Sequence, residues 1–589
     1  MKRNLLIALS ALFAVCGCSF LESFPDGSYN EDNYSEYPTI IRGFIDKAYN
    51  LRSSSYYNTE FLGMDACSDD MMFRDKSSSV RQFAIGNAHM GSNPLINVWN
   101  RDYEAIYYVN LFLKDGLGRK TRYLVDPGSN EVLQKCLQGD AFGLRAWYGF
   151  NLLEFWGGVG TDGRLLGVYI PTEPVDVETY DGADLVRPTY DESVKQILAD
   201  CDSALLYLPP ANRDQYLQGE AFHVTGAIRY RALDGVSIMA LKAKVLLTWA
   251  SPAFNPNGDK SRWEMAAKAA REVIDFKLNK ERGGLDPKAS FMWTNPNTPE
   301  VIYLSDIVQN SSYETSFYPL GFGGSANIVP SQELVDAFPM ANGYPITDPA
   351  SGYDKSHPYV GRDPRFYASI FYDGCNVIRN QSPYTLMYTF DVADGGKDAP
   401  GGQKTSPSGY YVKKYVSLGW NPNDVSIQTA QHSIFFLRWT HMCLAFAEAA
   451  NQFAGPNTPV DGLTAKEALA YVRSRKVNTG TEDENGVGAA GDPYLDACAA
   501  SQAAFDKLVK NEWRVETCFE GIRFHNVRRW ATSVDEINVP VSGVSITAGN
   551  YTYSEIEKRS FPSLWVPIPY KEMRLAPGMI QNKGWEDWK

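Results

Sequence analysis

Two stretches of the chain carry aromatic and polar side chains of the kinds that hold a ligand. Residues 65–74 are expected on a loop, and Trp99 and Asn100 follow at the start of a predicted helix. Residues 277–430 form a second stretch that is rich in Gly, Pro, Asn and Tyr. The candidate ligand-binding residues in and beside these stretches are Asp65, Asp69, Asp70, Phe73, Arg74, Trp99, Asn100, Trp293, Tyr313, Tyr318, Tyr372, Asp373, Arg379 and Tyr388.

A sugar ring presents an apolar face of C–H groups and an edge of hydroxyl groups. A flat aromatic ring can cover the face, while carboxylate, amide or guanidinium groups replace water at the edge. The alternative interpretation is structural: Asp69 and Asp70 would lie in a solvated turn or cap a helix, and Trp99 would pack against other helices. Aromatic residues make up 13% of the chain, and most of them are expected to line a core.

No motif for covalent, metal or cofactor chemistry stands out. The sequence holds no Gly-x-Ser-x-Gly elbow, P-loop, dinucleotide fingerprint or His-Glu-x-x-His motif. The seven cysteines beyond Cys16 and Cys18 are dispersed, and none forms a Cys-x-x-Cys pair. We therefore expect no enzyme, no cofactor and no metal, while bound calcium is neither indicated nor excluded. The enzymatic alternative is a glycoside hydrolase, which needs two carboxyl groups about 5–9 Å apart, a separation that sequence does not give.

The charge balance argues against a nucleic-acid partner. There are 56 Lys and Arg residues against 69 Asp and Glu residues, which gives a formal net charge of -13. Neutralising a phosphate backbone requires clustered Lys and Arg, and the sequence contains no basic block of that kind. We therefore expect no nucleic acid among the partners.

The N-terminus has the features of a lipoprotein leader. Lys2 and Arg3 precede residues 5–15, which are apolar apart from Ser10. That stretch is shorter than the roughly 20 residues of a membrane-spanning helix and fits the apolar part of a signal peptide. It ends in Val-Cys-Gly-Cys, which resembles a bacterial lipobox with Cys18 as the lipidated residue. We therefore expect a signal peptide at residues 1–17, a body at residues 18–589, and membrane attachment through lipid alone.

Helical periodicity dominates the rest of the chain. Thr189 and Glu192 form the pattern of a capping box, and Ser261 and Glu264 form a second one. Predicted helices cover about 40–50, 98–113, 132–156, 190–205, 236–249, 263–274, 435–453, 464–476 and 503–518. Several of them form pairs that resemble tetratricopeptide repeats. The expected fold is mainly α, with a helix-pair scaffold at about 30–276 and 430–589 and an inserted loop-rich, ligand-binding portion at about 277–430.

Several segments, taken in order, resemble blocks of the SusD/RagB family of outer-membrane lipoproteins. They are residues 18–22, 144–159, 330–338, 361–366, 437–449, 512–530 and 565–585. The resemblance implies a SusD-like fold and a partner, a SusC-like TonB-dependent transporter, to which the protein delivers captured oligosaccharides or polysaccharides. It also implies an outer-membrane location facing the cell exterior and no catalysis. In some branches of the family the ligand is a peptide, which remains an alternative here.

Charged residues in the same blocks have a structural interpretation. Buried or half-buried arginine usually pairs with carboxylate, so we expect internal ion pairs rather than ligand contacts at these positions. The residues concerned are Arg362, Asp363, Arg365, Glu516, Glu520, Arg523, Arg528 and Arg529.

The lipobox gives the first testable prediction. Replacing the cysteine that carries the lipid, Cys18→Ala, should release the protein from the membrane fraction into the soluble periplasmic fraction, because no other anchor is expected. Fractionation of cells that express the variant, followed by immunoblotting, measures this. A variant that stays in the membrane fraction would count against lipidation at Cys18.

Overall fold

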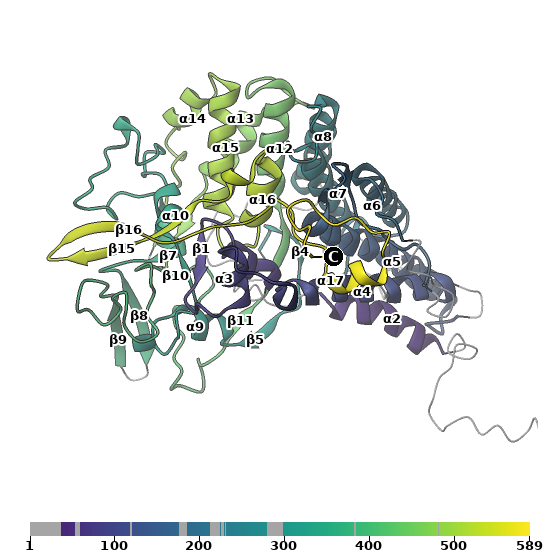
Figure 1. Ribbon diagram of the computed structural model, residues 1–589, viewed down its shortest axis with the longest axis horizontal. Helices are drawn as coiled ribbons and strands as arrows, with labels where there is room; N and C mark the ends of the chain where they lie inside the picture. The colour runs from purple at the N-terminus through teal and green to yellow at the C-terminus, as the bar shows by residue number, and fades with distance from the viewer. Residues whose placement is uncertain are drawn as a thin grey trace, which may run out of the picture.

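The structure is a computed structural model of the full chain. It describes residues 37–52, 59–117, 121–175, 185–212, 224, 229, 231–279, 298–381, 384–480 and 482–588. The expected lipidation site, Cys18, and the candidate Trp293 lie outside the described residues. Long helices occupy one side of the molecule, and a half built of short strands and loops occupies the other, with the hairpin β15–β16 projecting from its edge (Figure 1).

Long helices that pack against their neighbours in the sequence form the scaffold. They are α2 (Pro38–Asn50), α4 (Ile96–Asp115), α5 (Pro127–Trp156), α6 (Tyr190–Leu205), α7 (Gly235–Ala250), α8 (Lys260–Asn279), α12 (Trp439–Ala454), α13 (Ala465–Arg473), α15 (Gln502–Glu516) and α16 (Arg523–Trp530). Helix α5 packs on α4 and α6, α7 on α6 and α8, and α12 on α8, α13 and α15. This arrangement confirms the prediction of a mainly α, tetratricopeptide-like fold.

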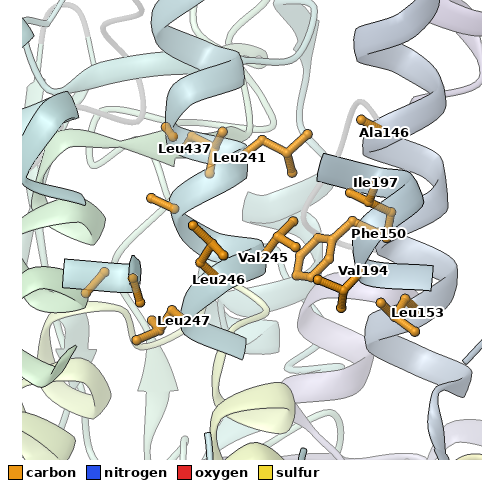
Figure 2. Close-up of a cluster of buried hydrophobic side chains, with 14 of the residues drawn as sticks. Ala146, Phe150, Leu153, Val194, Ile197, Leu241, Val245, Leu246, Leu247 and Leu437 are labelled. Carbon is orange, nitrogen blue, oxygen red and sulfur yellow. The ribbon is translucent and has the colours of Figure 1, made fainter. Parts of the chain in front are cut away.

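Apolar side chains at helical spacing join these helices. Phe150 and Leu153 of α5 lie against Val194 and Ile197 of α6, and Val245 of α7 closes the cluster (Figure 2). Burying each such side chain stabilises the fold by about 1.5–3 kcal/mol. Small residues let α7 and α8 approach each other: Ala240 and Ala243 of α7 and Ala267 of α8 are fully buried.

One of the two predicted capping boxes is correct. The Thr189 hydroxyl accepts a hydrogen bond from the Glu192 N–H at 3.3 Å, and the Glu192 carboxylate accepts one from the Thr189 N–H at 2.7 Å. The box at Ser261 and Glu264 is wrong, because α8 already begins one residue before Ser261. There the N–H and the hydroxyl of Ser261 both donate to the Asp259 carboxylate, at 2.9 and 2.7 Å.

Short strands that pair two by two in antiparallel register build the other half. The pairs are β1 (Met71–Phe73) with β6 (Ile328–Pro330), β4 (Val301–Leu304) with β12 (Phe435–Arg438), β5 (Val308–Asn310) with β11 (Ala430–His432), β7 (Ile370–Phe371) with β10 (Tyr411–Val412), β8 (Asn376–Gln381) with β9 (Tyr384–Thr389), and β15 (Pro540–Thr547) with β16 (Asn550–Lys558). Short helices α9 (Ser312–Phe317), α10 (Gln332–Ala337) and α11 (Pro364–Ser369) lie between them. The predicted helix start at residue 435 is wrong, because β12 occupies residues 435–438.

A second apolar core fills the loop-rich half. Its centre is aromatic: Tyr318 stacks on Trp420 with ring centroids 5.9 Å apart. Met71 and Met72 of β1 and Val544 of β15 belong to the same core, although they are far away in the sequence. Three separate parts of the chain therefore build this half, and β15–β16 packs here, with β15 against α10.

A buried ion network lies where the two halves meet. Its members, all less than a tenth exposed, are Glu300, Asp363, Arg365, Lys414, Arg438, Arg473, Arg475, Glu512, Glu516 and Glu520. Arg438, at the start of α12, pairs with Glu516 at 3.0 Å and with Glu520 at 2.8 Å. Arg365, on α11, pairs with Glu512 at 2.8 Å and with Glu516 at 3.3 Å. The network thus connects α12 and α15 of the scaffold to α11 of the loop-rich half.

The ion pairs expected from the sequence form at most of the predicted positions. Arg529 pairs with Glu448 at 2.6 Å, and Arg523 pairs with Asp69 at 2.9 Å. The expectation is wrong for two arginines. The guanidinium of Arg362 donates to backbone carbonyls at 2.5–3.0 Å, and that of Arg528 lies between two aromatic rings.

Within the described part of the chain, no helix combines the length and the apolar character needed to cross a lipid bilayer.

The network gives a stability prediction. In Glu516→Gln, the guanidinium groups of Arg438 and Arg475 lose a buried carboxylate, which should lower the free energy of unfolding by about 3–5 kcal/mol. Urea titration followed by circular dichroism measures it. The control is Lys268→Ala, which removes an exposed pair with Glu264 and should change the free energy by less than about 0.5 kcal/mol. Equal effects of the two substitutions would contradict the assigned role of the network.

The stability difference between wild type and Glu516→Gln should depend on pH in a defined direction. Burial alone would raise the pKa of Glu516, but the guanidinium groups of Arg475 and Arg438 lower it well below its ordinary value. A lowered pKa in the folded state means that the carboxylate stabilises the fold above about pH 4.5 and loses this effect as the pH falls further. The difference in unfolding free energy between wild type and Glu516→Gln should therefore shrink below that pH.

Candidate functional site

The three aspartates of the early loop are fixed by internal contacts. Asp65 is fully buried, and its carboxylate accepts hydrogen bonds at 2.8 and 3.1 Å from two backbone N–H groups in the turn between α15 and α16. Asp69 pairs with Arg514 and Arg523, both at 2.9 Å, and Asp70 pairs with Arg514 at 2.6 Å. Burial, together with the charge of Asp70, raises the pKa of Asp65 to about 8. These side chains fasten the early loop to the scaffold. Asp65 and Asp70 are buried, which corrects their assignment as ligand contacts, while Asp69 is partly exposed and its ligand role stays a prediction.

Three of the predicted aromatic contacts lie in the cores. Trp99 is 5% exposed and meets Trp156 edge to face, with ring centroids 5.0 Å apart. Tyr313 and Tyr318 are 1% and 0% exposed. None of these rings has a face that a ligand could reach, so the prediction is wrong for all three. Asn100, the next residue on α4, is exposed.

Arg74 and Tyr388 lie at opposite ends of one loop, residues 320–327. The N–H of Arg74 donates to the carbonyl of Asn327 at 2.9 Å, and its guanidinium Nε donates to that of Ser325 at 3.1 Å. At the other end, a Cβ on Gly321 would lie 2.6 Å from the Tyr388 hydroxyl oxygen. Phe73, beside Arg74, pairs with Ile328 in the β1–β6 ladder. The structure therefore places these predicted residues along the same segment, residues 321–328.

Tyr388 is a poor platform for a sugar ring. The ammonium of Lys397 lies 3.7 Å from the centre of its ring and covers one face. Its hydroxyl donates to the Asp398 carboxylate at 2.6 Å, and Phe322 meets the ring edge to face at 5.0 Å. Arg379 lies opposite Leu386 in β8–β9, and its side chain is outside the described part of the structure.

Tyr372, by contrast, belongs to a group of tyrosines at the surface, and Asp373 lies beside that group. We call this group the tyrosine cluster; it consists of Tyr353, Tyr359, Tyr367, Tyr372, Tyr551 and Tyr553. Tyr359 lies at its centre, with its ring centroid 4.7 Å from that of Tyr372 and 5.6 Å from that of Tyr551. Tyr367 lies 6.0 Å from Tyr372 and donates its hydroxyl to the Tyr359 carbonyl at 2.7 Å.

The hairpin β15–β16 supplies two rings of the cluster. Its turn residues, Ala548 and Gly549, both have positive φ, at 51° and 78°, as the tight turns of β-hairpins require. Tyr551 and Tyr553 are two positions apart in β16 and therefore lie on the same face of the strand. Tyr353, from the loop opposite, shares a hydrogen bond with Tyr553.

The cluster combines accessible rings with polar edges. Tyr359 is 8% exposed and Tyr553 is 41% exposed, and the other four rings are half-buried. Tyrosine hydroxyls, with an ordinary pKa of about 10, are protonated at neutral pH and can both donate and accept. Burial raises the pKa of each of the five accessible hydroxyls further. The half-exposed carboxylate of Asp373 accepts a hydrogen bond from the Val392 N–H at 2.8 Å, which fixes it beside the rings.

Five of the six tyrosines of this cluster were not among the candidates predicted from the sequence, which included Tyr372 and Asp373. Tyr353, Tyr359 and Tyr367 lie within the loop-rich stretch 277–430, where no local pattern distinguishes them from buried tyrosines, and the hairpin that carries Tyr551 and Tyr553 lies far beyond it. The signal that could have found two of them is the alternation Tyr-Thr-Tyr at residues 551–553, one residue after the turn Ala548-Gly549. Such a turn predicts a hairpin, and the alternation then places both rings on one face.

The geometry described so far defines a class of protein: a helix-pair scaffold that carries a loop-rich half with an accessible aromatic surface. Two family models match the sequence over separate ranges. One, described as the SusD family, matches residues 299–585, and the other, described as starch-binding and associating with the outer membrane, matches residues 19–220. The chain belongs to the SusD/RagB family.

Solved structures from Bacteroides species share this fold. A SusD-like protein from Bacteroides fragilis aligns with a TM-score of 0.71 and 21% identity, over 94% of this chain and 99% of its own. A SusD-like carbohydrate-binding protein from the same species gives 0.67 and 17%, over 92% and 99%. Surface glycan-binding protein A from Bacteroides fluxus gives 0.58 and 18%, over 93% and 99%. No curated protein matches the sequence.

The placement of Trp99 leads to a prediction. Trp99→Ala should lower the free energy of unfolding by about 3–5 kcal/mol, because it empties a core site against Trp156. The adjacent Asn100→Ala, on the exposed side of α4, should change it by less than about 0.5 kcal/mol. Thermal and urea unfolding measure both. A tryptophan that contacted ligand from the surface would instead give a stable variant with weakened binding.

Proposed function

We propose that this protein captures oligosaccharides or polysaccharides at the cell surface and delivers them, without cleaving them, to a SusC-like TonB-dependent transporter. The tyrosine cluster is the observation that carries the proposal. In this interpretation the protein is held at the outer membrane by lipid on Cys18, and its body faces the cell exterior.

The chemistry of the cluster suits a sugar better than it suits an ionic ligand. Tyrosine rings offer apolar faces to C–H groups, and each phenol places a donor and an acceptor at the rim. Asp373 adds a fixed carboxylate, a good acceptor for paired hydroxyl groups of a sugar. Several rings at different angles can contact successive sugar units, so one surface can hold a chain along its length.

The rings are also held in place before any ligand arrives. Tyr372 packs against Phe366 at 5.0 Å and Tyr359 at 4.7 Å, and the hydroxyl of Tyr359 lies 3.2 Å from that of Tyr410. A ligand that binds to fixed rings loses less free energy to the ordering of side chains. Capture without chemistry depends on this kind of preorganised surface.

The relatives support the same class of ligand. Two of the similar structures are a SusD-like carbohydrate-binding protein and a surface glycan-binding protein, and one matching family model is described as starch-binding and associating with the outer membrane. The lipobox at Cys18 agrees with that location.

The proposal predicts a loss of glycan retention. The double variant Tyr551→Ala, Tyr553→Ala should weaken binding to a retained polysaccharide by about 1–3 kcal/mol, because it removes two ring faces from the cluster. Affinity electrophoresis on a panel of polysaccharides identifies the retained glycan and measures the loss. The matched control is Tyr107→Ala, which removes an exposed tyrosine of α4 outside the cluster and should leave retention unchanged.

Other outcomes would support the alternatives. Equal retention of the double variant and wild type would remove the cluster from the site. Retention of peptides, with no polysaccharide retained, would favour a peptide-capturing protein of the RagB type. Sustained release of reducing ends from a glycan would favour a glycoside hydrolase and end the proposal of capture without cleavage.

A further inference from the structure

Arg528, on α16, is a buried cation for which the described residues supply no carboxylate partner. It is 7% exposed, and its guanidinium carbon lies 3.5 Å from the ring centre of Phe524 and 4.5 Å from that of Phe561. Its one hydrogen bond within the described residues runs from Nη1 to the Phe524 carbonyl, at 3.3 Å. The buried Nε–H has no acceptor there. Aromatic faces attract the charge, but they do not neutralise it.

The other charged groups around Arg528 do not compensate for it. Arg559, whose charge acts on Arg528, is also a cation. Arg529 is matched by Glu448, with contacts of 2.6 and 2.7 Å. Glu154 is matched by Lys244 at 2.9 Å. Burial lowers the pKa of Arg528 to about 9, which reflects the cost of a charge left without a partner.

A small cavity adjoins Arg528. Its volume is about 20 Å³, which exceeds the roughly 10–15 Å³ that one water-sized sphere requires. Phe155, Phe254, Leu564 and Trp565 give it an apolar wall. Such a wall keeps the local dielectric low, so a charge bound there interacts strongly with the guanidinium.

His525 also lines the cavity and does not add a second charge. Burial, the largest cause, lowers its pKa to about 4, so the ring is neutral at neutral pH. Arg529 and Glu154 line the cavity too, but their charges are paired with those of Glu448 and Lys244, so among the described residues Arg528 contributes the one lining charge without an ion partner. A neutral water molecule could accept the Nε–H, but it would leave the charge unpaired.

We propose that the cavity beside Arg528 is a binding site for a single small inorganic anion of halide size, such as chloride. Its space is too small for a carboxylate-bearing metabolite or a sugar. The anion would complete a buried pair with the guanidinium between the two phenylalanine rings. This site lies in the scaffold and is independent of glycan capture at the tyrosine cluster.

The proposal predicts stability that depends on halide. At constant ionic strength, the melting temperature of the wild-type body should be roughly 2–4 °C higher in sodium chloride or bromide than in sodium gluconate. Crystals soaked in sodium bromide should show an anomalous peak beside Arg528. The variant Arg528→Gln should lose both signals, because it removes the charge that holds the anion.

Two further variants distinguish halide binding in this cavity from unfolding of Arg528→Gln and from a general effect of losing an arginine. Leu564→Phe enlarges a wall residue and keeps the guanidinium, so it should weaken the halide response even if Arg528→Gln does not fold. Arg271→Gln removes a guanidinium that pairs with Asp275 at the surface and should keep the full response. A wild-type protein with equal melting temperatures in the three salts and no bromide peak would overturn the proposal.

Discussion

The buried ion network between α11, α12 and α15 is the constraint on which the rest of the structure depends. Removing charges from water is costly, and these groups are tolerated inside because each glutamate of the network meets more than one cation and Asp363 is paired with Arg365. Glu516 alone contacts Arg365, Arg438 and Arg475. Such a set has few satisfactory geometries, so it fixes how the helical scaffold and the loop-rich half are placed relative to each other.

The candidate site depends on this placement through a short chain of contacts. Arg365 is held by the network at the start of α11, and the next residues, Phe366 and Tyr367, pack against Tyr372 at 5.0 and 6.0 Å. The hairpin β15–β16 reaches the same point from the other end of the chain and brings Tyr551 against Tyr359. The aromatic surface is thus assembled by long-range contacts around a rigid ionic base.

This construction explains what could be predicted from the sequence. The helices were predictable because periodicity and caps are local, as Thr189 and Glu192 show. The mainly α fold followed from them. Tyr318 and Tyr372 are both tyrosines in loops, and no local pattern says that the first is buried and the second is half-exposed. That difference comes from partners such as Trp420, about a hundred positions along the chain, so the candidate list mixed core and surface residues.

The buried arginines also show that local sequence does not identify the partners of a side chain. Expecting carboxylate partners for arginine was right for Arg365 and Arg529, and wrong for Arg362 and Arg528, although all four lie in similar motifs. Three backbone carbonyls accept hydrogen bonds from the Nη1 and Nη2 groups of Arg362, while its Nε finds no acceptor among the described residues. Two aromatic rings flank Arg528, and the described residues supply no carboxylate for it. Residue type indicates that a buried guanidinium needs a partner, and only the three-dimensional structure shows whether the chain supplies one. Where it does not, a bound ion becomes the simplest means of balancing the charge.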